Sequence, residues 1–332
     1  MRYLVLALLF CIASCKEVAS VQVLKGSALG TTYSIKYFSD ETVRPAEIDS
    51  ILQVINTSMS TYQEDSDISK INSGNASVQV DSHFQTVFKA SKTIHNQTNG
   101  FFDPSVGLLV NAYGFGPEGY SESVTEAQID SLFQFIGLEH IHLTEDNYIT
   151  FDSKVSYLDF NAIAKGYTVD VFAEFLESKG SENYLVEIGG EVRVKGQNVD
   201  NQSSWKIGIE LPLEDGSREL IYGVNLQDEA LATSGNYRKY RVDPETGKKY
   251  VHTINPRTGK SQKTDILSAS VITSNCTDAD AFATAFMAMG FQKSKAYLNQ
   301  VKDIEVIFIY SESDGTQKTF ISDSLQDAVD EF

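Results

Sequence analysis

The sequence is poor in cysteine and lacks long apolar runs, and both shortages limit the kinds of protein it can encode. Only Cys11, Cys15 and Cys276 occur, which excludes the disulfide framework of small secreted domains. After the first fifteen residues, no segment is long and apolar enough to cross a bilayer. Cys276 has no histidine near it in the sequence to activate a thiol, so we interpret it as a structural residue.

Positive charge is also scarce in this sequence. The chain has 27 Lys and Arg residues against 45 Asp and Glu residues, which gives a formal net charge of −18. Such a charge argues against nucleic-acid binding and against electrostatic adhesion to anionic lipid. A phosphate-bearing ligand would therefore have to be held locally, by a metal ion, a helix N-terminus or a few well-placed cations.

The N-terminus contains a short apolar run from Tyr3 to Ala13, which follows Arg2 and precedes Ser14-Cys15. This pattern predicts a cleaved bacterial lipoprotein signal over residues 1–14, a lipid-bearing Cys15 and a short tether over residues 15–20. A plain secretory signal that happens to contain Cys15 is the alternative. We expect a lipid-anchored protein of the bacterial cell envelope that faces the periplasm or the cell exterior.

The rest of the chain, residues 21–332, contains no repeat, low-complexity block or long linker, which favours a single domain. Several predicted strands are joined by short turns such as Gly189-Gly190, so we expect an α+β protein with antiparallel or mixed sheets flanked by helices. Helical periodicity predicts helices at 45–59, 82–98, 104–112, 125–135, 162–179, 277–289 and 291–300. Strands are predicted at 20–25, 31–38, 149–158, 183–188, 191–195, 205–210, 219–226, 250–254, 266–273 and 304–310.

The segment from Gly114 to Gly119 matches the glycine pattern of dinucleotide-binding loops, but its context is wrong. That fingerprint follows a strand and opens a helix, whereas residues 104–112 are predicted to be helical. Pro117-Glu118 would also place a carboxylate near the phosphates. We interpret the segment as a glycine-rich loop that closes the preceding helix.

Acidic and hydroxyl side chains begin the predicted helix at 277–289. Thr277 as N-cap with Asp280 at the third helical position would form a variant of the capping box, which explains Asp280 structurally. Asp280 and Thr284 are also four residues apart, so they share a helix face and offer two oxygens to a hard cation. A cation near the positive end of a helix needs further oxygens from another segment. Both interpretations stay open on these residues alone.

A second candidate segment runs from Leu158 to Asp170, where a strand is predicted to end at Asp159 and a helix to begin near Ala162. Lys165 would lie in the first turn of that helix, which the helix dipole disfavours for a cation. Its position therefore suggests an anionic partner. Pairing with Asp159, or simple solvation, is the alternative.

His252 lies at the end of a predicted strand, just before the break at Asn255-Pro256. An imidazole there is either a half-buried structural side chain or a general base, because histidine changes its protonation near neutral pH.

Taken together, these segments resemble the ApbE family of FAD:protein FMN transferases, formerly named thiamine biosynthesis lipoproteins. The resemblance covers nearly all of the chain after the signal. The motifs that carry it are Gly30-Thr31, Met59 to Tyr62 with Asp65-Ser66, Gly100 to Asp103 with residues 107–117, Asp159 to Gly166, Gly189-Gly190, Ala232 to Tyr237, His252 to Gly259, and Thr277 to Gly290.

The resemblance implies Mg²⁺-dependent cleavage of FAD, transfer of FMN through its phosphate to a Thr or Ser of an acceptor protein, and release of AMP. Implied acceptors are subunits of membrane redox complexes or flavin-carrying domains. It implies a T-fold-like domain with two lobes. The implied metal ligands are Asp280, Thr284 and the carbonyls of Ala162 and Ala283. The implied flavin or adenosine contacts are Leu29, Tyr62, Phe101, Phe102, Asp103, Asp159, Lys165 and Ile254, with His252 at the family's histidine.

The chain departs from the family pattern at four of these motifs. Leu29 stands where Met is usual, Asn161 replaces a small Gly or Ser, and Asn255 replaces the commoner Asp. Glu191 follows Gly189-Gly190 where a shorter Asp or Asn is common, so we assign its side chain no ligand contact.

Two other functions remain compatible with the sequence. One is a Mg²⁺-dependent FAD pyrophosphatase, in which water replaces the acceptor hydroxyl and the products are FMN and AMP. The other is a flavin-binding lipoprotein without catalysis, in which Asp280 and His252 are structural.

Overall fold

The computed structural model describes residues 21–117, 119, 124–213, 215, 217–236, 240–243, 246–247, 249–261 and 263–332. The predicted signal, the tether and Cys15 lie outside the described residues, as do Glu118 and Tyr237. Within the part that the structure describes, no helix has the length and apolar character needed to span a membrane.

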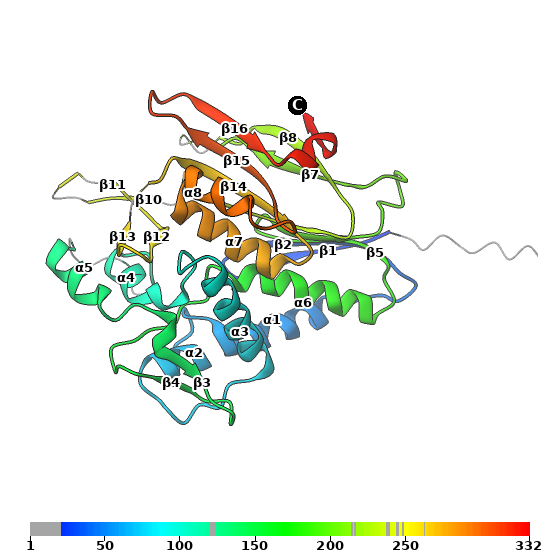
Figure 1. Cartoon of the computed structure of the whole chain (residues 1–332). Coiled ribbons are helices and arrows are strands. Elements are labelled where there is room, and N and C mark those ends of the chain that lie inside the picture. Colours follow the sequence, from blue (N-terminus) through cyan, green and yellow to red (C-terminus); the bar gives the residue numbers. More distant parts are fainter. Residues whose placement is uncertain are drawn as a thin grey trace, which may run out of the picture.

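The centre of the fold is an eight-stranded sheet in which every neighbouring pair is antiparallel (Figure 1). Alternating burial along β5 is typical of a strand with two unlike faces. In spatial order, the strands are β1 (Val21–Ala28), β2 (Thr31–Phe38), β5 (Asn183–Ile188), β6 (Glu191–Lys195), β9 (Ala230–Gly235), β14 (Ile266–Thr273), β15 (Glu305–Ser311) and β16 (Gln317–Ile321).

One face of this sheet is covered by a small antiparallel sheet of β7 (Trp205–Glu210), β8 (Leu220–Leu226) and β17 (Val329–Glu331). A hydrophobic cluster joins the two sheets, with Val192 and Ile272 from the large sheet and Trp205 and Val224 from the small one. The indole N–H of Trp205 donates to the carbonyl of Lys195 at 3.0 Å, so the buried ring keeps its polar atom paired.

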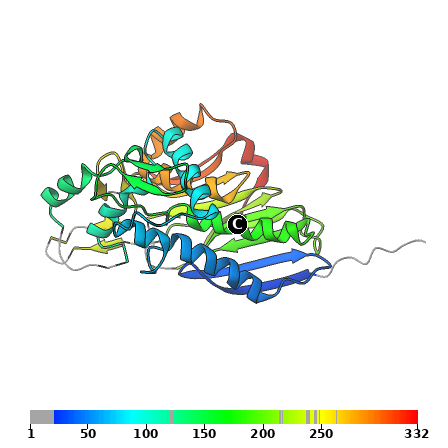
Figure 2. The ribbon, with the colours of Figure 1, turned by 90° about the horizontal axis from the view of Figure 1, so that it is seen from below.

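The other face carries the helices, with α6 (Ala164–Ser178) and α7 (Cys276–Met289) against the sheet. Helix α7 is buried along almost its whole length, as expected for a helix with apolar residues on all sides. Helix α1 (Pro45–Met59) packs beside α6 on the same face of the sheet, as Figure 2 shows, and α3 (Ser82–Gln97) packs against α1 and α7.

Shorter elements complete the described fold. The helices are α2 (Asp67–Asn72), α4 (Gly107–Ala112), α5 (Glu126–Phe133) and α8 (Phe291–Leu298), with 3₁₀ turns at Pro104–Val106, Leu138–His140 and Asp323–Ala328. The strand pairs are β3 (Ile141–Leu143) with β4 (Ile149–Phe151), β10 (Tyr240–Val242) with β11 (Lys249–Val251), and β12 (Ile254–Asn255) with β13 (Lys260–Ser261).

The predicted α+β class with antiparallel sheets is confirmed, and many elements have the predicted bounds. The strand predicted at 149–158 was too long, because only 149–151 pair with β3. The strand predicted at 250–254 is two short strands, separated at His252 and Thr253. Strand β9 was missed, because its sequence ALATSG is low in strand-forming residues. Its small side chains let α7 pack closely on the sheet.

Asp170 joins α6 to the N-terminus of α7. Its carboxylate accepts hydrogen bonds from the N–H groups of Cys276 and Thr277 at 2.9 and 2.8 Å, and from the Thr277 hydroxyl. It also pairs with Arg193 of β6 at 2.9 Å. Since the first N–H groups of a helix have no partner within the helix, this buried carboxylate supplies what the start of α7 requires.

We expect Asp170→Ala to lower the free energy of unfolding by about 3 kcal/mol, because it leaves two buried N–H groups unpaired and removes the shorter of the two ion pairs of Arg193. Urea unfolding followed by circular dichroism measures this. Glu41→Gln is the control, because Glu41 makes only an exposed ion pair with Lys179 and should change stability by less than about 0.5 kcal/mol. Equal losses in both variants would contradict the capping role.

Candidate functional site

Asp280 lies on α7 where that helix crosses α6. The N-cap of α7 is Asn275, whose side chain accepts from the N–H of Asp278 at 2.8 Å. The predicted capping box of Thr277 and Asp280 is therefore wrong, because α7 begins earlier than expected and Asn275 occupies the cap. Asp280 is only 4% exposed, and its Oδ2 accepts from the N–H of Gly166 at 3.0 Å. Burial raises the pKa of Asp280, against the opposing effects of Lys165 and this N–H.

The Gly166 N–H belongs to the first turn of α6, which begins at Ala164 after the N-cap Ile163. The first N–H groups of a helix have no partner within the helix, and this one donates to Asp280. The carbonyl of Ala162 precedes the N-cap, and within the described residues it accepts no backbone hydrogen bond. The Ala162 carbonyl and the Asp280 carboxylate thus both keep capacity for a cation.

The close approach of the two helices depends on the absence of a side chain at Gly166. A Cβ atom at this position would lie 2.2 Å from the carbonyl oxygen of Cys276 and 2.8 Å from the Cβ of Asp280. Any larger residue would push α6 away from α7. Gly166 therefore sets how closely the start of α6 approaches Asp280.

The other two predicted metal ligands follow Asp280 along α7. The Thr284 hydroxyl lies 3.4 Å from the Ser234 hydroxyl at the end of β9, a long hydrogen bond that leaves Thr284 able to turn toward a ligand. Ala283 lies inside α7, where its carbonyl belongs to the helical hydrogen-bond ladder and offers only its second lone pair. A carboxylate, a hydroxyl and main-chain carbonyls are the donors that Mg²⁺ prefers, so these residues fit a hard cation.

Lys165 forms an ion pair with Glu191, the first residue of β6. The predicted anionic partner is thus present, while pairing with Asp159 and free solvation are both wrong. Burial acts to lower the pKa of Lys165, but the carboxylates of Glu191 and Asp280 outweigh it and raise the pKa above its ordinary value. Burial raises the pKa of Glu191 to about 7, although Lys165 opposes the shift. This pairing could not be predicted from local sequence patterns, because it joins a helix to a distant strand.

Asp159 organises the segment before α6. Its N–H donates to the carbonyl of Pro104 at 2.8 Å, and its Oδ1 accepts from the N–H of Asn161 at 2.7 Å. Burial raises the pKa of Asp159. The Asn161 amide donates to the Thr61 hydroxyl at 3.3 Å, so the side chain that departs from the family pattern connects this segment to the one carrying Tyr62. Tyr62 is 63% exposed, so its ring is available for stacking on a planar ligand.

Phe102 and Asp103 are less available to a ligand than the sequence suggested. Phe102 is 2% exposed and belongs to the main hydrophobic core, so stacking on a planar ligand falls to Tyr62 or the half-buried Phe101. The carboxylate of Asp103 accepts from the N–H and hydroxyl of Ser105 and from the N–H of Leu138. These bonds cap the 3₁₀ turn at Pro104–Val106, which makes Asp103 a residue that shapes the site.

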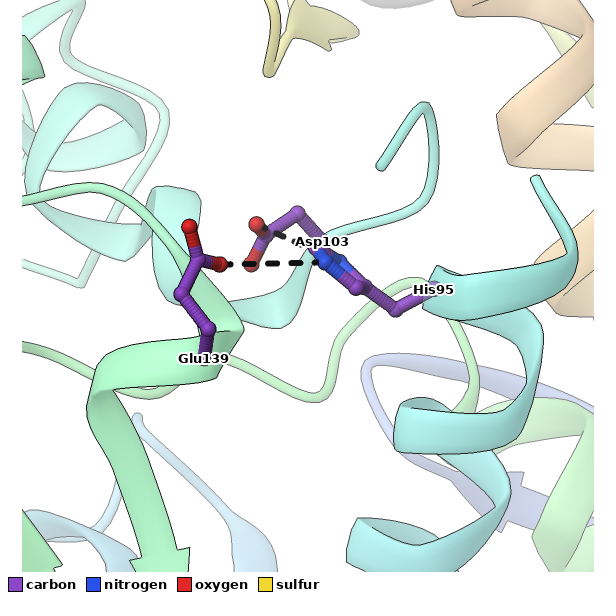
Figure 3. Close-up of side chains that lie close together, drawn as sticks. All are labelled: His95, Asp103 and Glu139. Atoms are coloured by element: carbon purple, nitrogen blue, oxygen red, sulfur yellow. Dashed lines mark ion pairs between the residues drawn. The ribbon is translucent and has the colours of Figure 1, made fainter. Parts of the chain in front are cut away.

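Figure 3 shows Asp103 within a cluster with His95 and Glu139, whose ligand atoms lie within 4.8 Å of one another. The Nδ1 atom of His95 is 3.1 Å from the Phe102 carbonyl and 3.4 Å from Asp103. A contact with a carbonyl requires a hydrogen on Nδ1, so only Nε2, 3.8 Å from Glu139, keeps a lone pair. With Asp103 and Nδ1 already engaged, the cluster is a set of polar contacts that holds the 99–103 turn against α3. Sequence reasoning missed it because its members have no motif spacing.

His252 lies between β11 and β12, with its ring 6.5 Å from the ring of Phe115 between centroids. The next residue, Thr253, donates to the side chain of Asn236 at 2.8 Å. Asn236 directly follows β9, the strand whose Ser234 contacts Thr284. The segment with the histidine is therefore fixed to the strand that touches the proposed metal ligands.

Ile254 is buried in a satellite hydrophobic cluster with Leu109 and Tyr113, so it contributes to the wall beside His252. Asn255 has a clear structural role. Its amide donates to the carbonyl of Ala288 near the C-terminal end of α7 at 3.2 Å, while its Oδ1 accepts from the N–H of Arg257 at 2.9 Å. An aspartate could replace the second contact but not the first.

Leu29 lies at the tip of the β1–β2 hairpin with φ of 48°, followed by Gly30 with φ of 75°. A non-glycine residue in this conformation is strained, which is common at ligand sites. The hairpin tip borders an open groove of about 820 Å³, whose other side is formed by α1 and by Gln63 and Asp65. Gly189 donates to the carbonyl of Thr32 at 3.0 Å, so the groove lies at the end of the sheet where β6 begins with Glu191.

Comparison with known proteins agrees with this geometry. The model of the ApbE family matches residues 29–308. The FAD:protein FMN transferase of Vibrio cholerae is 38% identical over 318 residues, covering 93% of both chains, and that of Escherichia coli is 30% identical over 313 residues, covering 91% of this chain and 87% of the relative.

Two solved structures are also similar to this chain. The flavin transferase ApbE from Vibrio cholerae superposes with a TM-score of 0.82 at 36% identity, over 93% of this chain and 99% of that one. The apo flavinyl transferase ApbE from Pseudomonas stutzeri gives a TM-score of 0.81 at 28% identity, over 94% and 98% of the two chains. The predicted family and fold are confirmed.

We expect Asn255→Asp to lower the free energy of unfolding by about 1–3 kcal/mol, because a carboxylate would face the Ala288 carbonyl without a hydrogen to donate. Thermal and urea unfolding at neutral pH measure the loss. Asn255→Gly, which removes both contacts without adding a charge, is the comparison variant. Wild-type stability in Asn255→Asp would show that the amide is not needed as a donor.

Proposed function

Because the chain belongs to the ApbE family, we propose that it is a Mg²⁺-dependent FAD:protein FMN transferase. The observation that carries the metal dependence is the hydrogen bond from the Gly166 N–H to Asp280, which holds the start of α6, with the Ala162 carbonyl just before it, against α7. That pair of oxygens, with Thr284 on the next turn of α7, forms a site for a hard cation.

Bound there, Mg²⁺ would neutralise the charge of the diphosphate during phosphoryl transfer. The chain's own residues supply the rest of the site. Lys165, held by its ion pair with Glu191, places an ammonium group within electrostatic reach of the metal ligand Asp280, where it adds positive charge for the phosphates. The exposed ring of Tyr62 stacks on one of the planar rings of FAD. Leu29 forms an apolar wall at the tip of the β1–β2 hairpin.

In the transfer step, the hydroxyl oxygen of an acceptor Thr or Ser bonds to the phosphorus of the FMN half, and the diphosphate bond breaks. AMP leaves with the bridging oxygen. His252 takes the proton from the attacking hydroxyl, because it lies on the segment fixed to β9 beside Thr284.

We also propose a cellular location for the protein. Cys15 carries a lipid after removal of residues 1–14, so the enzyme is anchored to the bacterial cell envelope and faces the periplasm or the cell exterior. Its acceptor is a protein with a flavinylated Thr or Ser, such as a membrane redox subunit or a flavin-carrying domain.

The direct test is incubation with FAD, Mg²⁺ and a threonine-bearing flavin-carrying domain. We expect the acceptor to gain the mass of FMN less one water, as a phosphoester forms and AMP appears in equal amount. An acceptor whose threonine is replaced by valine is the control. Free FMN with no modified acceptor would instead identify a pyrophosphatase, and no cleavage of FAD would identify a flavin-binding protein.

For the metal site, we expect Asp280→Asn to lose transfer activity at limiting Mg²⁺ by about a hundredfold, because a hard cation with few protein ligands would lose its carboxylate. Activity is measured across a Mg²⁺ titration. Asp278→Asn is the matched control, since Asp278 lies on the first turn of the same helix and contacts Asn275. Wild-type turnover in Asp280→Asn at limiting Mg²⁺ would exclude Asp280 as a ligand.

For His252, we expect His252→Asn to bind FAD normally and to transfer FMN about a hundredfold more slowly, since a general base typically contributes at least that factor. Binding is followed by flavin fluorescence and transfer under single-turnover conditions. His83→Asn is the control, because His83 lies on α3, away from the β11–β12 segment, and contacts the Tyr167 hydroxyl of α6. Normal transfer by His252→Asn would return this histidine to a structural role.

A further inference from the structure

The site contains a second buried carboxylate, Glu191. The family pattern commonly has a shorter side chain, Asp or Asn, at this position. Glu191 is 2% exposed, and its Oε1 pairs with Lys165. Its other oxygen, Oε2, makes no hydrogen bond in the described part of the chain. A buried carboxylate is costly unless it is paired, so its position requires a reason.

Lys165 has two carboxylates within electrostatic reach, and it pairs with only one of them. Asp280 contributes to raising the pKa of Lys165, yet the ion pair is formed with Glu191. In a buried site, an ammonium group associates with whichever carboxylate can reach it, because charge interactions are strong at low dielectric. Without Glu191, the remaining partner for Lys165 would be Asp280.

The position of Glu191 in the central sheet determines which carboxylate Lys165 pairs with. Gly189 and Gly190 form a tight turn with φ of 61° and 106°, after which β6 begins directly with Glu191. The side chain of Glu191 thus comes from a strand of the central sheet, while Lys165 and the Gly166 N–H come from the first turn of α6. Lys165 is drawn toward the sheet, and the adjacent Gly166 N–H donates to Asp280 on α7.

We infer that Glu191 is a positioning residue that holds the Lys165 ammonium group away from Asp280 and so keeps the Asp280 carboxylate available for a divalent cation. This inference rests on the proposed metal site. It also explains why a carboxylate without a predicted ligand contact is buried at this position: it acts on the metal ligand through Lys165. A longer side chain than Asp or Asn reaches Lys165 from the start of β6.

The experiment measures Mg²⁺ binding directly, by calorimetry and by the Mg²⁺-dependent rise in melting temperature, with no substrate present. We expect Glu191→Gln to bind Mg²⁺ about tenfold more weakly or worse, a loss typical of changes around metal ligands. Glutamine keeps the size and one acceptor oxygen of Glu191 but not its charge. Glu187→Gln is the matched control on the same hairpin, because it keeps the contact to the Gly190 N–H.

The decisive variant combines Glu191→Gln with Lys165→Met. If Glu191 acts only by holding Lys165, then removal of the ammonium group restores Mg²⁺ affinity to near the wild-type value. Affinity in the double variant as weak as in Glu191→Gln alone would overturn the inference, because Glu191 would then act on the cation or the packing itself. Unchanged affinity in Glu191→Gln would overturn it as well.

Mg²⁺ binding by the wild-type chain and by Asp280→Asn distinguishes failure of this inference from failure of the proposed metal site. Absence of any Mg²⁺ binding by wild type, with Asp280→Asn behaving identically, would overturn the metal site and the inference with it. Mg²⁺ binding that depends on Asp280 but not on Glu191 would overturn the inference and leave the metal site intact.

Discussion

The hydrogen bond from the Gly166 N–H to Asp280 is the contact on which the rest of the site depends. It forms because a glycine lets the start of α6 approach α7 more closely than any side chain would allow. It orients the Asp280 carboxylate and pairs one of the first N–H groups of α6, while the Ala162 carbonyl, which precedes the N-cap, accepts no backbone hydrogen bond in the described part of the chain. Asp170 fixes the same crossing from its other side by holding the first N–H groups of α7.

The charges around the crossing of α6 and α7 also explain how an acidic protein could bind a diphosphate and a cation. A chain with a net charge of −18 repels a diphosphate, and the start of a helix repels a cation. At this crossing, Asp170 and Asp280 place negative charge at the start of α7, which offsets its dipole and makes a cation acceptable there. Lys165 then adds a positive charge whose position is set by Glu191. The local arrangement, rather than the overall charge, decides which ligand the site accepts.

The sequence predicted what depends on local pattern and missed what depends on contacts between distant segments. Alternating residues predicted β5, β6 and β14 at their observed bounds, whereas β9 was missed because close packing against α7 selects small side chains over strand formers. Asp280 and Lys165 were predicted as candidate site residues, and the structure brings them within electrostatic reach of each other. The cap of α7, the partner of Lys165 and the engagement of Asp103 could not be predicted, because each depends on a residue from another element or on where a helix begins.

The residues that depart from the family pattern also make contacts between segments that are distant in the sequence. Asn255 and Asn161 donate hydrogen bonds that hold one segment against another, to the Ala288 carbonyl and to the Thr61 hydroxyl. Glu191 contacts Lys165 at the junction of sheet and helix. None of these side chains needs to touch a ligand to matter, because each fixes a segment that carries a candidate site residue. Variation at such positions therefore changes the contacts that support the site, while the candidate metal ligands and His252 stay the same. A substitution at a supporting position should accordingly be judged by the contacts that the new side chain makes.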